Sequence, residues 1–216
     1  MSTDNSGHEC LGKGAGLRKG RPVDTAKRDA ILDAAVDQFF DVGFAASSIE
    51  RIAEIAGVSK VTVYNQFGGK EALFKAAVEA ECEKMRGRML PEIDDVPLAQ
   101  RLAMIAHGMH GFLFRPNMLR FERRLASEAE RHPELGRTFL ESGPRRMKAA
   151  LADVMRRAAA RGELELDDPE LAAEQFAGMV KGMADLEWRF AGEHDPAVNQ
   201  RRIDAAVETF LRAYAA

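Results

Sequence analysis

The stretch IERIAEIAGVSKVTVYNQFGGKEALF, residues 49–74, decides the fold. It predicts two short helices joined by a tight turn at Gly57, with Ser59 as the cap of the second helix. Ala53 is small enough for the second helix to cross the first closely, and Gly57 can adopt a positive φ without steric cost. Val63 is placed to fill the angle between the two helices. This spacing is typical of a helix-turn-helix, and a tight corner in any all-helical protein is the alternative.

The outward face of the second predicted helix is polar, and no acidic residue occurs between Val58 and Lys70. Its side chains are Ser59, Lys60, Thr62, Tyr64, Asn65 and Gln66. Amides can bind the adenine edge, lysine the guanine edge and hydroxyls the phosphates. Lys70 starts the next predicted helix, whose free N–H groups also attract phosphate. We therefore expect this face to contact DNA.

The rest of the sequence is also helical in pattern, which predicts an all-α fold. Apolar residues recur at helical spacing from about residue 25 to residue 42, and Gly43 ends that helix. A long helix is expected over residues 70–89. Further helices are expected at about 97–114, 117–131, 133–142, 144–162, 169–191 and 196–214. No alternating pattern typical of a strand competes with them.

Composition excludes several classes of protein. The 216 residues carry a net charge of −3 and are 46% hydrophobic, which excludes a disordered chain and a wholly polybasic nucleic-acid binder. Two cysteines, Cys10 and Cys82, cannot form a disulfide framework, and they favour a reducing, cytoplasmic location. No apolar run approaches the ~20 residues that span a bilayer, and residues 1–16 contain no apolar segment typical of a secretory signal.

Residues 1–22 are rich in glycine and serine and become basic toward their end, at Lys13, Arg18, Lys19 and Arg21. This composition predicts a flexible tail. Two interpretations are open, a solvated leader and an arm that touches the phosphates or the minor groove of DNA.

The N-terminal part of the sequence resembles the TetR family of bacterial transcriptional regulators. The residues that carry the resemblance are Arg21-Pro22, 31–35 (ILDAA), Phe39-Phe40, Gly43-Phe44, 52–59 (IAEIAGVS), 62–67 (TVYNQF) and 70–74 (KEALF). The resemblance implies a three-helix DNA-binding domain over residues 23–70, whose third helix enters the major groove. The resemblance implies DNA contacts from Ser48, Lys60, Val61, Thr62, Tyr64, Asn65, Gln66 and Lys70. Ser59, on the same polar face, completes our set of candidate DNA contacts. Position 66 is often His in the family and is Gln here, which leaves the preferred bases open.

Residues 71–216 resemble the regulatory and dimerisation domain of the same family, with helix 70–89 connecting the two domains. The segments 129–135 (AERHPEL), 162–164 (GEL) and 168–173 (DPELAA) resemble the AefR-like branch. The expected partners are a double-stranded, pseudo-palindromic DNA operator, a second copy of the chain and a small effector.

Among the candidate pocket residues of the second half, methionine and phenylalanine outnumber isoleucine and valine, which favours a deformable apolar pocket between helices. Our candidate effector contacts are Met104, His107, Phe121, Phe139, Met147 and Phe176. For any one of them, ordinary helix core is the alternative. The charged pair Glu122 and Arg123 is expected on a solvated face.

The last two expected helices carry sustained apolar stripes, and Gly178 and Gly182 would permit close helix approach. Such helices can pair with their twins as a four-helix bundle, although packing within one chain is the alternative. The candidate dimer contacts are Phe176, Met179, Gly182, Ile203, Val207 and Phe210.

Signals for catalysis or metal binding are weak. His107 and His110 lie three residues apart, but zinc needs three or four ligands and no third candidate is near in sequence. No nucleophile elbow, phosphate loop or HExxH motif accompanies Cys82. We therefore expect no metal, no cofactor and no enzymatic activity, and we interpret the chain as a homodimeric, ligand-responsive repressor. Two rivals remain, a small helical enzyme using Cys82 or His107, and a DNA binder that lacks sequence specificity or a ligand.

Overall fold

A computed structural model of the chain describes residues 22–89, 96–192 and 195–216. The predicted N-terminal tail therefore lies outside the described residues, apart from Pro22. Helices make up the described regions, and within those regions the only β-type pairing is a single bridge between Leu164 and Ala215. The all-α prediction is confirmed. No helix in the described ranges is long and apolar enough to cross a membrane.

The first four helices are α1 (Pro22–Val42), α2 (Ile49–Ile55), α3 (Lys60–Phe67) and α4 (Lys70–Met89). The expected helix boundaries are reproduced because the local signals are strong. Gly43 follows α1 at φ 90° and Gly68 follows α3 at φ 85°, both in the left-handed conformation that ends a helix. Ser48 and Ser59 cap α2 and α3 by accepting N–H groups three residues later.

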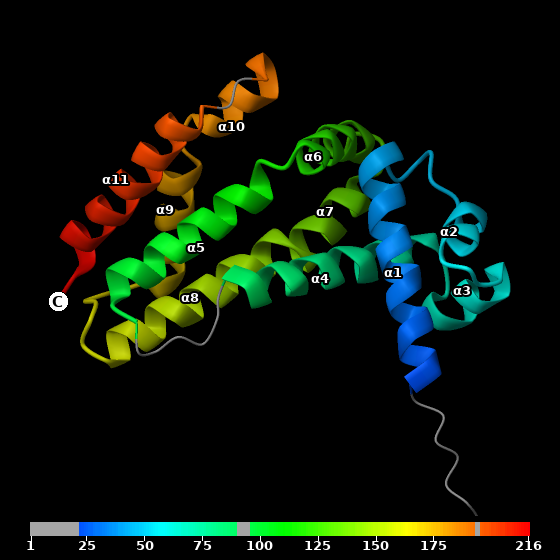
Figure 1. Cartoon of the computed structure of the whole chain (residues 1–216), viewed down its shortest axis with the longest axis horizontal. Coiled ribbons are helices and arrows are strands. Elements are labelled where there is room, and N and C mark those ends of the chain that lie inside the picture. The colour runs from blue at the N-terminus through cyan, green and yellow to red at the C-terminus, as the bar shows by residue number, and fades with distance from the viewer. Residues whose placement is uncertain (1–21, 90–95, 193–194) are drawn as a thin grey trace, which may run out of the picture.

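The remaining helices are α5 (Leu98–Leu113), α6 (Pro116–Ala129), α7 (Pro133–Ser142), α8 (Pro144–Ala160), α9 (Pro169–Lys181), α10 (Ala184–Leu186), the π-helical turn η1 (Glu187–Ala191) and α11 (Pro196–Tyr214). Of these helices, α6 and α7 lie beside α1 and α4, whereas α5, α8, α9, α10 and α11 lie farther from α2 and α3 (Figure 1). Proline at the first position starts five of them, α6, α7, α8, α9 and α11, where its missing N–H costs nothing.

One expected helix is wrong. The sequence predicts a single helix over residues 169–191, but α9 ends at Lys181 and the chain turns at Gly182, which has φ 47° and ψ −145°. The positive φ favours glycine there, and a Cβ would lie 2.8 Å from the Arg202 side chain, which would have to shift. The turn separates α9 from the short α10 and η1.

Two hydrophobic cores hold the chain together, and they do not follow the expected boundary at residue 70. One core joins α5, α8, α9 and α11 around buried Phe176 and Phe210. The other joins α1 to α4 with residues of α6 and α7, including Phe121 and Leu135. Helices α1 to α4 therefore share their core with two helices of the C-terminal part.

Candidate nucleic-acid interface and ligand cavity

Helices α2 and α3 form the predicted helix-turn-helix. Ala53 and Val63 are buried between them, and Gly57 in the turn has φ 66°. The Val58 N–H donates to the Ala53 carbonyl at 2.9 Å, which closes the turn. These three positions behave as the spacing predicts.

The outward face of α3 is exposed and mixed in character. Val61 is 65% exposed and Tyr64 is 44% exposed, and Lys60 and Asn65 are exposed beside them. The Ser59 and Thr62 hydroxyls lie 2.9 Å apart, within hydrogen-bonding distance. Short polar and apolar groups on an exposed helix of this length can reach base edges in a major groove.

Gln66 is less available than the sequence suggests. Its side chain is only partly exposed, and its Oε1 atom is buried. A base contact through Oε1 of Gln66 therefore requires a change of side-chain conformation. Its neighbour Asn65 is exposed and needs no such change.

Lys60 is paired with an acidic residue that sequence reasoning missed. Its ammonium group forms an ion pair with Glu50 of α2 and lies 5.6 Å from the Tyr64 ring centroid. The hydrogen bond between them lowers the pKa of Glu50 and raises the pKa of Lys60. Glu50 thus places a negative charge beside the exposed face of α3.

Lys70 is held against the loop between α1 and α2. Its ammonium donates to the Ala45 carbonyl at 3.3 Å and lies 4.6 Å from the Phe44 ring centroid. Burial lowers its pKa. A contact from Lys70 to phosphate therefore competes with its contact to the loop.

Arg28 of α1 is a second residue absent from the predicted set. Its guanidinium lies 4.5 Å from the ring centroid of Phe67, at the end of α3. Arg28 is exposed, and Lys27 beside it is exposed as well. The adjacent basic pair near the start of α1 was the available sequence signal.

Helix α6 packs directly against α1 and the loop before α2. The Phe121 ring stacks on Phe40 of α1 with centroids 4.3 Å apart, and the Arg124 guanidinium donates to the Phe40 carbonyl at 3.3 Å. At the end of α6, both oxygens of Glu128 accept the Ala45 N–H at 3.2 Å. The loop before α2 is thus fixed by α6.

Met118 and Glu122 of α6 line a cavity of about 390 Å³, within the range of small-molecule sites. Helices α4 to α9 enclose it. The lining residues are Cys82, Met85, Ile105, Met109, Phe112, Leu113, Met118, Glu122, Phe139, Gly143, Pro144, Met147, Lys148, Leu151, Glu174, Ala177, Gly178 and Lys181.

Only Phe139 and Met147 of the six predicted effector contacts line this cavity. Phe121 and Phe176 are buried in the two cores instead. Met104 and His107 are exposed on α5, where His107 lies 3.3 Å from the Gln200 amide of α11. Helical periodicity placed them on apolar stripes but could not tell which stripe faces a space.

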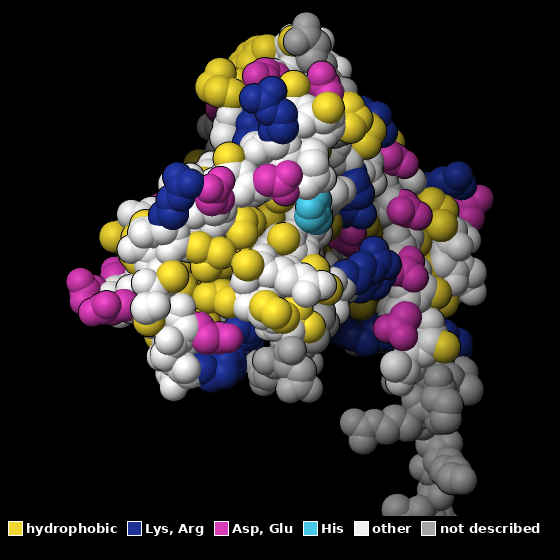
Figure 2. Space-filling model, turned by 60° about the vertical axis from the view of Figure 1, so that its left-hand side comes forward, with side chains coloured by type: hydrophobic (Ala, Val, Ile, Leu, Met, Phe, Trp, Pro, Cys, Tyr) yellow, Lys and Arg dark blue, Asp and Glu magenta, His cyan; other side chains and the backbone are white. Residues whose placement is uncertain are grey.

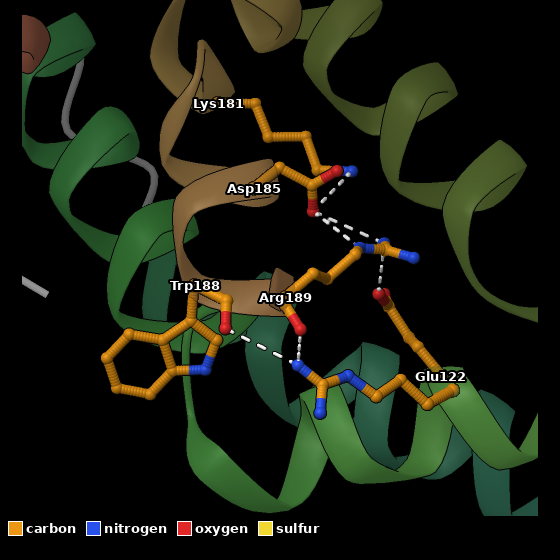
Figure 3. A network of polar contacts seen from close by, with 6 residues as sticks. Glu122, Lys181, Asp185, Trp188 and Arg189 are labelled. Carbon is orange, nitrogen blue, oxygen red and sulfur yellow. Dashed lines mark hydrogen bonds and ion pairs between the residues drawn. The ribbon is translucent and has the colours of Figure 1, made fainter. Parts of the chain in front are cut away.

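The expectation of a solvated face for Glu122 was also wrong. Glu122 reaches from α6 to Arg189 of η1, and their side chains meet at 2.8 Å (Figure 3). Arg189 and Lys181 both contact Asp185 Oδ1, at 3.2 and 3.4 Å. Burial raises the pKa of Glu122, while Arg189 and Lys181 oppose that shift. The arrangement depends on the turn at Gly182, which the sequence did not reveal.

The neighbouring Arg123 adds a second link between α6 and η1. Its guanidinium donates to the backbone carbonyls of Trp188, at 3.4 Å, and of Arg189. The cavity wall and the segment after α9 are therefore joined by both side chains of the pair.

Cys82 lies at the wall of the cavity beside Gly143. Burial raises the pKa of its thiol to about 11. The thiol is therefore neutral near pH 7 and is a poor nucleophile there.

The predicted dimer contacts need revision. Phe176, Ile203, Val207 and Phe210 are at most 8% exposed within the single chain, so they offer no surface to a partner. Gly182 is exposed at the turn and Met179 is half-buried. The exposed large apolar residues after α8 are Leu171, Met183, Leu186, Phe190 and Val198. On the face shown in Figure 2, apolar side chains gather in a hollow among charged side chains of both signs.

Comparison with known proteins agrees with this architecture. A family model described as "AefR-like transcriptional repressor, C-terminal domain" matches residues 100–216, and one described as "Bacterial regulatory proteins, tetR family" matches residues 31–77. The chain belongs to the TetR family. This TetR-family chain is a DNA-binding transcriptional regulator.

Solved structures share the fold over most of this TetR-family chain. A putative TetR-family regulator from Mesorhizobium loti has a TM-score of 0.76 and 31% identity, covering 89% of this chain and 98% of its own. The flavonoid-responsive regulator FrrA has a TM-score of 0.72 and 34% identity, covering 88% and 98%.

Sequence relatives match over shorter lengths. The regulator RutR of Escherichia coli is 48% identical over 54 residues, about a quarter of either chain. The regulator BetI of Rhizobium meliloti is 28% identical over 163 residues, 74% of this chain and 77% of its own. The strongest identity therefore lies in a short segment of the size of the DNA-binding unit.

Proposed function

We propose that this chain is a sequence-specific repressor that acts in the cytoplasm and releases its operator when a small, mostly apolar effector binds. The observation that carries the proposal is the position of α6. Met118 and Glu122 of α6 line the cavity, while Phe121 and Glu128 of the same helix contact α1 and the loop before α2. A ligand that shifts α6 would therefore change the placement of α3.

The repressor role is supported by the family model for the C-terminal region, whose description names a repressor. The effector is supported by the cavity, which is lined by methionines and aromatic rings that adapt to irregular ligands. The similarity to FrrA, which is named as flavonoid-responsive, agrees with an aromatic effector.

We propose a homodimer whose contact surface is formed by the exposed apolar residues of α9, α10, η1 and α11. A two-fold dimer presents two copies of α3, so the operator should be a pseudo-palindrome with half-sites one helical turn apart, ~34–36 Å, or a multiple of it. The residues of this surface are Leu171, Met183, Leu186, Phe190 and Val198.

Selection of binding sites from a random duplex library tests the proposal. We expect a symmetric consensus whose affinity exceeds that of random duplex by about 10³-fold or more. Equal affinity for all duplexes would contradict sequence-specific regulation. A consensus whose binding is insensitive to every ligand that raises the melting temperature would contradict the effector role.

A further inference from the structure

The cavity has an unusual balance of charge that bears on what it can bind. Glu122, Lys148, Glu174 and Lys181 line it. Lys148 contacts Glu174 at 3.2 Å, and Lys181 contacts Asp185 at 3.4 Å. Each lining charge therefore already has an opposite partner among the described residues.

Glu122 is the least exposed of these groups, with its side chain 18% exposed. Its ion pair with Arg189 uses Oε2. Among the residues that the structure describes, no donor reaches its other oxygen, Oε1. The rest of the wall consists almost entirely of apolar side chains, together with the neutral thiol of Cys82.

A charged ligand would bring an unpaired charge into this surrounding, because no described lining group is left to neutralise it. Burial of an unpaired charge is strongly unfavourable. A fully apolar ligand would leave Oε1 of Glu122 covered and without a donor, which is also unfavourable. A neutral ligand with a hydroxyl group avoids both costs.

We infer that the cavity takes an electrically neutral ligand with an apolar, aromatic-sized body and a hydroxyl group that donates a hydrogen bond to Oε1 of Glu122. This inference rests on the proposed function, because it specifies the chemical class of the effector. It also assigns Glu122 as the residue that selects for the hydroxyl group, with Arg189 as the residue that positions it.

Four compounds of one shape test the inference on the full chain: biphenyl, biphenyl-4-ol, biphenyl-4-carboxylate and 4-phenylbenzylammonium. Their affinities are measured by calorimetric titration near pH 7, where the phenol is neutral. We expect biphenyl-4-ol to bind at least about tenfold more tightly than the other three, as a hydrogen bond to a charged acceptor implies.

Two variants change the net charge of the Glu122–Arg189 pair, one making it more positive and the other more negative. Glu122→Gln leaves Arg189 less neutralised, so the affinity for biphenyl-4-carboxylate should rise about tenfold. The affinity for biphenyl-4-ol should fall, because the charged acceptor is gone. Arg189→Gln leaves the Glu122 carboxylate without its cation, so 4-phenylbenzylammonium should gain instead. Glu141→Gln, an exposed residue of α7 paired with Arg145 and not part of the cavity wall, is the matched control and should change none of the four affinities.

Tighter binding of a charged compound than of biphenyl-4-ol to the wild-type chain would overturn the inference. Equal binding of biphenyl and biphenyl-4-ol would overturn it as well, and so would the absence of binding by all four. Each of these results leaves the proposed function standing if the chain still binds a selected operator and another apolar compound releases it. Loss of sequence-specific DNA binding by the wild-type chain is the separate result that overturns the proposed function.

Discussion

The backbone of Ala45 is held on both sides by residues of other helices, and Glu128 supplies one of the contacts. Both Glu128 oxygens accept the Ala45 N–H at 3.2 Å, while Lys70 donates to the Ala45 carbonyl at 3.3 Å. The carboxylate comes from the C-terminal part of the chain and the ammonium from α4. The position of the loop before α2 therefore depends on the relative positions of α6 and α4.

Loss of the Glu128 contact should weaken the connection between the cavity and DNA. We expect Glu128→Ala to lower the free energy of unfolding by about 0.5–1.5 kcal/mol, as loss of a partly exposed hydrogen bond implies. The ratio of operator affinities with and without ligand should fall as well. Glu128→Gln, which retains an acceptor oxygen, is the control, and an unchanged ratio in Glu128→Ala would exclude this route.

Glu50 should restrain binding to DNA of any sequence. Its carboxylate pairs with Lys60, so Glu50→Gln leaves that cation free for phosphate. We expect the affinity for random duplex to rise about three- to tenfold at low salt. The slope of log affinity against log salt concentration should become steeper by roughly one. Filter binding across a salt series measures both effects. Glu83→Gln, whose residue pairs with Arg86 on α4, serves as control. An identical response of both variants would show that only net charge matters.

Lys70 and Asn65 should have separable roles in DNA binding. Lys70→Ala removes a cation at the start of α4 and should weaken all duplexes alike, with a salt slope lower by about one. Asn65→Ala removes an exposed amide and should cost roughly 1–3 kcal/mol at particular base pairs only. Gln66→Ala should have the smaller sequence-dependent effect, since its Oε1 is buried. Competition with single-base operator variants distinguishes these outcomes, and uniform losses in all three would contradict the assignment.

The turn at Gly57 should reject β-branched residues because of backbone strain alone. Apart from Gly57 itself and its two chain neighbours, no described residue has an atom within 4 Å of a Cβ built there, whereas φ is 66°. Gly57→Val should therefore lower both the melting temperature and operator affinity, and Gly57→Asn should have a smaller effect because Asn tolerates this conformation. Thermal melts and DNA titrations of the two variants provide the comparison. Equal stability of both would show that the turn relaxes to another geometry.

The revised contact surface predicts which substitution dissociates the dimer. Phe190 is 85% exposed on η1, so Phe190→Asp removes an apolar contact without disturbing the core of one chain. We expect a monomer in sedimentation and a loss of operator affinity, because a single α3 makes half the contacts. Leu140→Asp on α7, at a position 44% exposed and outside this surface, should remain dimeric. A dimeric Phe190→Asp protein would place the interface elsewhere.

Sequence reasoning succeeded where the determining signal is local. Caps at Ser48 and Ser59, glycines at 43 and 57 and the plug at Val63 each act within a few residues, and the structure reproduces them. It failed where two distant segments decide the outcome. A stripe containing Phe176 and Phe210 faces the chain's own core, because α5 and α8 cover it. Periodicity shows that an apolar stripe is buried. It does not show whether helices of the same chain or a second copy of the chain bury it.

The polar members of the cavity were missed for the same reason. Glu122 next to Arg123 reads as an ordinary solvated pair, and only the turn at Gly182 brings Arg189 within 2.8 Å of it. Methionine content did favour a pocket, and Met147 lines one, but the choice among ten methionines depended on tertiary packing.

Helices α1 to α4 share a core with α6 and α7. This shared core limits the exchange of the first four helices between proteins. A fragment ending after α4 would expose the rings of Phe40 and Phe74 that Phe121 covers. We therefore expect such a fragment to be unstable on its own. A fusion of this fragment to the ligand-binding domain of another protein would need aromatic residues there to cover Phe40 and Phe74. A substitution at Phe121 therefore alters the packing of α1 and α4 as well as that of α6.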